Sequence, residues 1–350
     1  MDENLKIHKN IINANEKKNF FYGLSILKVL LAFDVINGHC FHKISTSNKI
    51  ILYFMRSNKL HVPSFIIMSF FFTHNILISS DFHRICKRFE RLLIPYIGWP
   101  IILFCIYNLI LLSGKKYYTF SFKKLIHQII LGNAWTIPFH FWFLFDLILT
   151  SIIFLLILKT MKNHYLFIFL ILLMFSYFLQ YSELNYKLFI ILGEPSLAKE
   201  NEFIPYAVTG FILFESNIMN KLYEKKIKTF IISSIFLKLT EYYEVFSSIE
   251  GFAFQGIKSN IRSVCLIFIF SLFSSKGKEY KYTKIFKTIT SFTGGIYYIH
   301  RIIQWNFINI FKDIKKGTFF GIILIYIISY MICFIGTIIF GKTRLKYLFS

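Results

Sequence analysis

The chain has 350 residues, of which 55% are hydrophobic, and its mean hydropathy is +0.56. This is too apolar for a soluble protein of that length, so the composition predicts an all-α polytopic membrane protein. The net charge of +22 would suggest nucleic-acid binding in a soluble protein. Because the basic residues cluster between apolar runs, we expect loop charges that orient helices and meet the lipid bilayer, and no nucleic-acid partner.

About ten apolar segments are long enough to cross a bilayer as helices, and they predict one transmembrane bundle. More Lys and Arg fall on the side of the two termini than on the other side, which places both termini in the cytoplasm. The bundle is expected to occupy residues 21–340, between basic tails at 1–20 and 341–350. The spans lie near 21–41, 60–80, 92–112, 138–159, 164–182, 203–219, 229–247, 261–275, 289–311 and 318–340.

The first span, FYGLSILKVLLAFDVINGHCF, carries three ionisable side chains inside an apolar run: Lys28, Asp34 and His39. Such groups are rare at membrane depth and indicate a functional site. Lys28 and His39 are eleven residues apart, so they share one helix face at a separation of roughly 16 Å. Asp34 lies about 140° round the helix from His39, so the two are not paired. The sequence does not identify a partner for Asp34.

A basic segment, HRICKRFERLLIPYIGWP, precedes the third span. Arg84, Arg88 and Arg91 line one helix face, and Arg88 with Arg91 forms an R-x-x-R pair. Two guanidinium groups one turn apart suit a phosphate or pyrophosphate. Basic residues at inner helix ends are also the topological norm, so both interpretations stay open. Pro95 and Pro100 are expected to break the helix just inside the membrane.

Two further spans contain polar groups that lie in or near apolar runs. NAWTIPFHFWFLFDLIL carries His140, Trp142 and Asp146, and GGIYYIHRIIQWNF carries His300. Two membrane histidines, His39 and His300, favour a shared polar cavity. The cysteines show no paired spacing, which predicts neither a disulfide nor a metal site.

Six segments in order resemble the membrane-bound acyltransferase-3 family. They are VINGHCF, VPSFIIMSFFF, KRFERLLIPYIGW, FHFWFL, IPYAVTGFIL and GGIYYIH. Three positions depart from the family pattern, since Lys28 stands where many members have arginine, Ser25 where an acidic residue is common, and Phe70 in place of a glycine. No departure removes a histidine or an R-x-x-R arginine.

The resemblance implies transfer of an acyl group to a sugar hydroxyl of a cell-surface polysaccharide or a lipid-linked sugar. It implies acetyl-CoA as donor, with succinyl-CoA as the alternative, in the inner or plasma membrane. His39 and His300 are the expected catalytic residues, and His39 acts either as a base or as an acyl carrier. The remaining expected contacts are Arg88, Arg91 and Lys28 for the CoA donor, and His140 and Trp142 for the acceptor.

Three other classes of membrane protein have similar features. An exporter of a glycan or glycan intermediate would also have polar spans and basic faces, but such transporters often show internal repeats, which we do not find. A glycan polymerase would usually carry a longer outer loop. A membrane scaffold would leave His39 and His300 without explanation.

Overall fold

The computed structural model describes residues 19–20, 22–40, 60–79, 81–112, 121–132, 142–182, 195–216, 218–242, 256–273, 275–276, 288–310 and 319–350. This part of the chain is helical almost throughout, with twelve α-helices and one short 3-10 helix, η3. Its only strands are two residues each, β1 (Asn19–Phe20) and β2 (Ser275–Lys276), and they pair antiparallel. The predicted all-α class is therefore confirmed for the described residues.

Each of the ten predicted spans overlaps one of the helices of the structure. These ten are α2 (Tyr22–Cys40), α4 (His61–Ile78), α5 (Phe82–Leu112), α7 (Trp142–Thr160), α8 (Tyr165–Tyr181), α10 (Pro195–Glu215), α12 (Lys226–Tyr242), α13 (Ile257–Ser271), α15 (Thr293–Ile310) and α16 (Phe319–Phe340). Two shorter helices, α6 (Phe122–Leu131) and α11 (Ile218–Glu224), and η3 (Arg344–Leu348) complete the set.

Four helices in the described part of the chain are both long and apolar enough to cross a membrane: α4, α5, α7 and α16. Helix α8 is also apolar but shorter. The protein is thus a membrane protein by the composition of its helices. The count of about ten spans and the cytoplasmic position of both termini stay predictions.

Helix α5 is longer than the sequence suggested. It begins at Phe82 and runs through Pro95 and Pro100 without a break, so the predicted helix break is wrong. A proline removes one backbone donor, but in a membrane helix the neighbouring helices and local adjustments can satisfy the carbonyl that is left. Both prolines are buried against the rest of the bundle. The R-x-x-R pair is therefore on the same continuous helix as the apolar segment that follows it.

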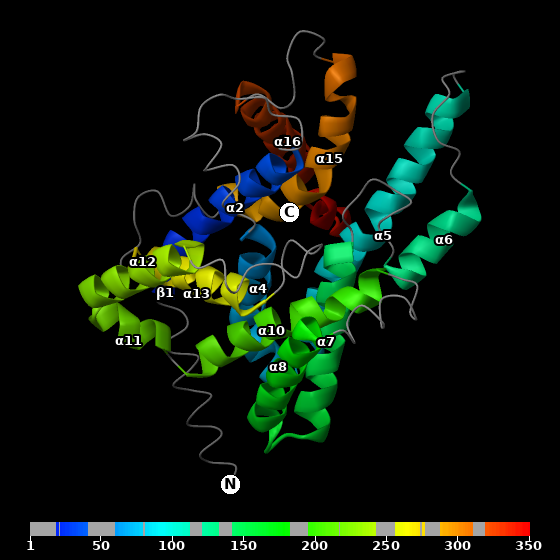
Figure 1. The fold of residues 1–350 in the computed structure, drawn as a ribbon. Coiled ribbons are helices and arrows are strands. Elements are labelled where there is room, and N and C mark those ends of the chain that lie inside the picture. The colour runs from blue at the N-terminus through cyan, green and yellow to red at the C-terminus, as the bar shows by residue number, and fades with distance from the viewer. Residues whose placement is uncertain are drawn as a thin grey trace.

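Helices α4 and α10 form the centre of the bundle, and α7, α8 and α13 pack around them (Figure 1). Gly210 of α10 lies directly against the backbone carbonyl of Ile67 in α4, where any Cβ would clash with that oxygen. A glycine here lets the two helix backbones approach closely, as small residues do in membrane bundles. This approach holds α4, and the polar residues it carries, at a set distance from α10.

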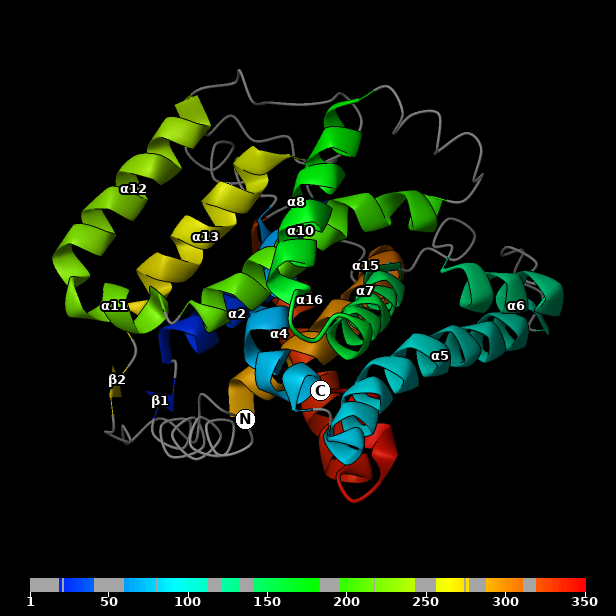
Figure 2. The ribbon, with the colours of Figure 1, turned by 90° about the horizontal axis from the view of Figure 1, so that it is seen from below.

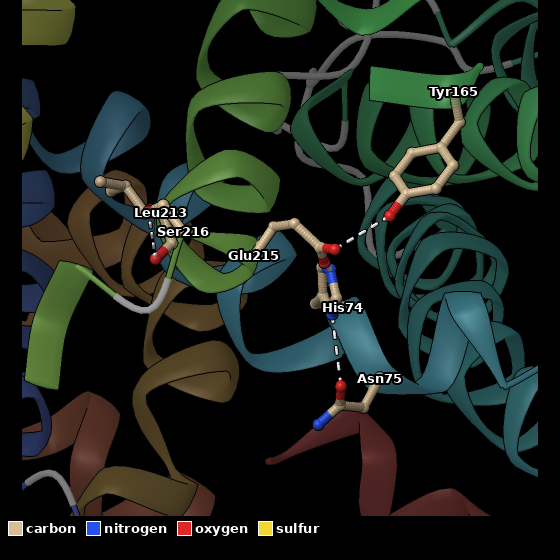
Figure 3. Close-up of polar contacts among 6 residues, drawn as sticks. All are labelled: His74, Asn75, Tyr165, Leu213, Glu215 and Ser216. Atoms are coloured by element: carbon tan, nitrogen blue, oxygen red, sulfur yellow. Dashed lines mark hydrogen bonds and ion pairs between the residues drawn. The ribbon is translucent and has the colours of Figure 1, made fainter. Parts of the chain in front are cut away.

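A polar cross-link joins three helices at one end of this central group (Figure 3). His74 Nε2 of α4 lies 2.6 Å from Glu215 Oε2 of α10, and Tyr165 of α8 donates a hydrogen bond of 3.0 Å to Glu215 Oε1. The His74 ring is also stacked on Phe214, with 4.4 Å between the ring centroids. These contacts tie the ends of α4, α8 and α10 together.

Helices α5 and α6 project from one side of the bundle, opposite α11 and α12 (Figure 2). The C-terminal residues fold back onto α5, since Trp99 Nε1 donates a hydrogen bond of 3.0 Å to the Leu348 carbonyl oxygen. Gly295 of α15 is also in close contact with the Phe349 carbonyl, where a side chain would not fit. The chain end is therefore part of the packed structure, between α5 and α15.

Candidate active site

Helices α2 and α15 place His39 and His300 face to face. The two imidazole rings are stacked, with their centroids 5.3 Å apart and an angle of 19° between the planes. His300 is fully buried and His39 is half-buried. The structure thus brings together two residues that are far apart in the chain, as expected for a shared polar site.

The two ring nitrogens of His300 have different surroundings. Nδ1 donates a hydrogen bond of 3.1 Å to the carbonyl oxygen of Ile296, one helical turn earlier. Because Nδ1 carries the proton in this bond, Nε2 is the acceptor nitrogen of the neutral ring. Nε2 is buried and has no hydrogen-bond partner among the described residues. An unsatisfied buried nitrogen of this kind is able to accept a hydrogen bond from a bound molecule.

A short chain of hydrogen bonds holds the end of α2 against α15. Gln304 Nε2 donates to the carbonyl oxygen of His39 at 2.7 Å, and Arg301 Nη1 donates to Gln304 Oε1 at 2.9 Å. These bonds fix the backbone of His39 relative to the helix that carries His300. The hydrogen bonds of Gln304 and Arg301 therefore help to hold the two imidazole rings in the stacked arrangement.

The structure also supplies a partner for Asp34. His61 Nδ1, at the first residue of α4, donates a hydrogen bond of 3.0 Å to Asp34 Oδ2. The His61 side chain is 7% exposed and that of Asp34 is 16% exposed. His61 also lies near enough to His300 for the two rings to interact electrostatically. The polar site therefore contains three histidines and one carboxylate.

His61 is a site residue that the sequence analysis missed. A signal for it was present, because an acidic residue inside an apolar span requires a partner. His61 stands at the start of α4, and it lies opposite Asp34 because α4 is a neighbour of α2. Sequence spacing alone does not show which helix is that neighbour.

A cavity of about 280 Å³ lies between α2, α4, α7 and α15, the helices that carry the polar site and its neighbours. Lys28 lines it, and its Nζ atom lies 4.6 Å from the centroid of the Phe72 ring, a cation–π distance. Tyr297 lines it as well, and its ring centroid is 6.0 Å from that of His300. The cavity thus reaches from Lys28 to a residue in contact with the histidine pair.

The two arginines of the R-x-x-R pair have different environments. Arg88 is buried, donates a hydrogen bond of 3.0 Å from Nη2 to Ser151 Oγ, and stands over the Phe70 ring. Arg91 is exposed, and its Cζ atom lies 5.7 Å from the centroid of the Tyr347 ring. Arg88 therefore points into the bundle between α4 and α7, and Arg91 points toward the C-terminal segment.

Trp142 begins α7 and is buried among aromatic side chains, with its ring edge-to-face to Phe203 at 5.6 Å between centroids. His140 lies outside the described residues. The predicted role of His140 and Trp142 in binding the acceptor therefore stays a prediction. Within the described ranges, no group of three or more His, Cys, Asp or Glu side chains is placed to hold a metal ion.

Apolar helices around a buried cluster of histidines define a polytopic membrane protein with an internal polar site. The family model for the acyltransferase domain of the acyltransferase-3 type matches residues 21–342, which is nearly the whole chain. The chain therefore belongs to the acyltransferase-3 family and is a membrane acyltransferase. Searches of the curated proteins and of the solved structures returned no match.

Proposed function

We propose that this acyltransferase moves an acetyl group from acetyl-CoA to a hydroxyl group of a cell-surface polysaccharide or a lipid-linked sugar, in the inner or plasma membrane. The observation that carries the proposal is the stacked pair His39 and His300, inside a domain of the acyltransferase-3 family. Succinyl-CoA is the alternative donor, because the pair itself does not select the acyl group.

The chemistry needs a base near the reacting hydroxyl. A histidine takes the hydroxyl proton while the oxygen attacks the thioester carbonyl carbon, and the C–S bond then breaks. The departing CoA thiolate takes up the proton, so the histidine is regenerated. Imidazole suits both steps, because its unperturbed pKa is near neutrality. His39 is the proposed base or acyl carrier, and the buried Nε2 of His300 is the proposed second contact to the reacting groups.

The cavity supplies a place for the acyl end of the donor. Lys28 lines the cavity with its ammonium group, and Tyr297 connects it to the histidine pair. In the predicted orientation Lys28 lies nearer the cytoplasm than His39, where CoA is found. The donor would then enter from the cytoplasmic side with its thioester directed inward, while the sugar acceptor approaches His39 from the opposite side.

Asp34 acts through His61 in this proposal. A carboxylate that accepts the Nδ1 proton of a histidine fixes the ring orientation and leaves Nε2 as the acceptor nitrogen. The same bond joins α2 to α4 close to His39 and His300. Asp34 and His61 are therefore proposed as positioning residues of the histidine cluster.

The direct test uses purified protein in lipid nanodiscs with acetyl-labelled acetyl-CoA and a surface-glycan acceptor. Transfer of label to the glycan supports the proposal. Intact glycan export without any label transfer would instead support an exporter. Mass spectrometry of surface glycans, from cells with and without the protein, then identifies an acetyl or a succinyl mass difference.

A second measurement distinguishes the two roles of His39. With acetyl-CoA and no acceptor, an acyl carrier releases a rapid burst of CoA equal to the enzyme present. A base acting on the acceptor hydroxyl gives no such burst. Either result identifies one role, and retention of full activity by a His39→Ala variant would contradict both.

A further inference from the structure

A second pocket, of about 250 Å³, lies between the first turns of α5 and the C-terminal segment that follows α16. Its lining comes from two segments that are far apart in the chain, 83–90 and 342–347. It is separate from the histidine cluster and shares no lining residue with the cavity beside Lys28. We call it the basic pocket. Its lining residues are His83, Cys86, Lys87, Glu90, Lys342, Thr343, Arg344, Lys346 and Tyr347.

The basic pocket carries a strong excess of positive charge. Lys87, Lys342 and Lys346 have no acidic partner in the part of the chain that the structure describes. The single carboxylate of the lining, Glu90, is already paired with Arg344, with 3.0 Å between Oε1 and Nη1. Among the described residues, three ammonium groups therefore line one concave space without an acidic side chain paired to any of them.

Two of the cations near this pocket share one aromatic ring. Lys346 Nζ lies 5.5 Å from the centroid of Tyr347, and Arg91 Cζ lies 5.7 Å from the same centroid. Tyr347 itself is buried, so the ring is held in place. Two like charges near one ring repel each other, and an anion close to both would reduce that repulsion. The arrangement is thus complementary to a bound anion of high charge.

The basic pocket is also joined to the cavity beside Lys28 through the chain end. Lys346 and Tyr347 are followed directly by Leu348, Phe349 and Ser350. The carbonyl oxygen of Ser350 lies 2.8 Å from the point where a Cβ of Gly294 would stand, and Gly294 lines the cavity. The C-terminal residues therefore run from the basic pocket to α15, the helix that lines the cavity with Gly294.

We propose that the basic pocket binds a phosphate-bearing group. Lysine ammonium groups and a guanidinium are the side chains that bind phosphate most strongly. The phosphate has two sources: the nucleotide end of CoA, or the headgroup of an anionic lipid. The CoA source rests on the proposed function, and it would hold the donor at its polar end while the acyl end enters the cavity. The lipid source would anchor α5 and the C-terminal segment to the membrane surface.

The test is a double variant, Lys342→Gln with Lys346→Gln, in the full-length protein. Both side chains are exposed or half-buried at the surface, so the variant should fold, and size-exclusion chromatography in detergent checks this. The matched control is Lys159→Gln with Lys162→Gln, which removes the same charge from the exposed end of α7 and the turn that follows it.

Three probes are used: CoA, dephospho-CoA, which lacks the ribose phosphate, and nanodiscs of phosphatidylcholine with or without phosphatidylglycerol. If CoA is the source, the CoA dissociation constant rises about tenfold in the double variant and stays unchanged in the control. Dephospho-CoA then binds wild type more weakly than CoA does. If lipid is the source, CoA binding is unchanged, and native mass spectrometry shows less phosphatidylglycerol bound to the double variant only.

The proposal is overturned if the double variant changes neither CoA affinity nor phosphatidylglycerol binding, or if the control changes them equally. Binding is measured without an acceptor, so this outcome is independent of acyl transfer. Wild-type protein that transfers acetyl but shows no effect of the double variant would refute the basic pocket alone. Protein that binds phosphatidylglycerol there but transfers no acyl group would refute the proposed function alone.

Discussion

The histidine cluster (Asp34, His39, His61 and His300) and the basic pocket are both polar, but their charged side chains differ in pairing and in exposure to solvent. In the cluster, Asp34 and His61 are paired at 3.0 Å and largely shielded from solvent. In the basic pocket, the lysines are exposed or half-buried and lack acidic partners among the described residues. A buried charge without a partner is costly, whereas an exposed charge is solvated by water. The cluster therefore favours a fixed geometry, and the pocket has the charge that the proposed anion site requires.

This difference predicts how each region responds to substitution. Removing a polar group from the cluster should alter the geometry of the site and the stability of the bundle. Removing a charge from the basic pocket should alter binding and leave the fold intact. The following changes break or sharpen that comparison, from the largest expected effect to the smallest.

His39→Ala should reduce the rate of acyl transfer by about 10²–10⁴-fold, because it removes the proposed base or carrier. The amount of protein in the membrane should not change, since His39 is half-buried at the end of α2. Transfer of labelled acetyl measures the rate, and immunoblotting of membranes measures the amount. The matched control is His164→Ala, at the exposed turn before α8, which should keep full activity.

Asp34→Asn should lower the free energy of unfolding by about 1–3 kcal/mol, because it leaves the buried His61 without its charged acceptor. His61→Gln should have a similar effect, and the double variant should cost less than the sum of the two. Thermal unfolding in detergent measures all three. Asp81→Asn, which breaks the exposed pair with Arg84, should change stability by less than about 1 kcal/mol. Equal effects at the two pairs would argue against a buried, positioning role for Asp34.

Arg88→Ala should mainly reduce the stability of the protein, whereas Arg91→Ala should mainly weaken the binding of the acetyl-CoA donor. Arg88 is 8% exposed and bonded to Ser151, so its loss should reduce stability by about 1–3 kcal/mol. Arg91 is exposed beside Tyr347, so its loss should change stability by less than about 0.5 kcal/mol while raising KM for acetyl-CoA. Thermal unfolding and steady-state kinetics on the same preparations check both. An unchanged KM in Arg91→Ala would count against a phosphate contact at that residue.

Glu90→Gln should have the smallest effect on stability, less than about 1 kcal/mol, because its partner Arg344 has a side chain that is 78% exposed. It should nevertheless strengthen anion binding in the basic pocket, since it removes the only carboxylate of the lining. The CoA dissociation constant should fall a few-fold at low salt and return to the wild-type value at high salt, where the charges are screened. Weaker CoA binding at low salt would contradict the expected direction.

The helices were largely readable from the sequence, because apolar length decides where a chain can form membrane helices. The continuous helix through Pro95 and Pro100 was not readable, since its tolerance of proline depends on neighbouring helices. A shared site for His39 and His300 was expected from the rarity of histidines in membrane spans. The separation of Arg88 from Arg91 did not follow, because two residues one turn apart can still meet different neighbours.

The sequence by itself determined that this is a helical membrane protein of the acyltransferase-3 family, and which span carries Lys28, Asp34 and His39. Those properties depend on apolar run length and on short local motifs. Only the tertiary structure decided that Asp34 meets His61 and that residues 83–90 and 342–347 surround one basic pocket. Both depend on which helices become neighbours, and that is settled by close packing, as at Gly210 against Ile67, rather than by spacing along the chain.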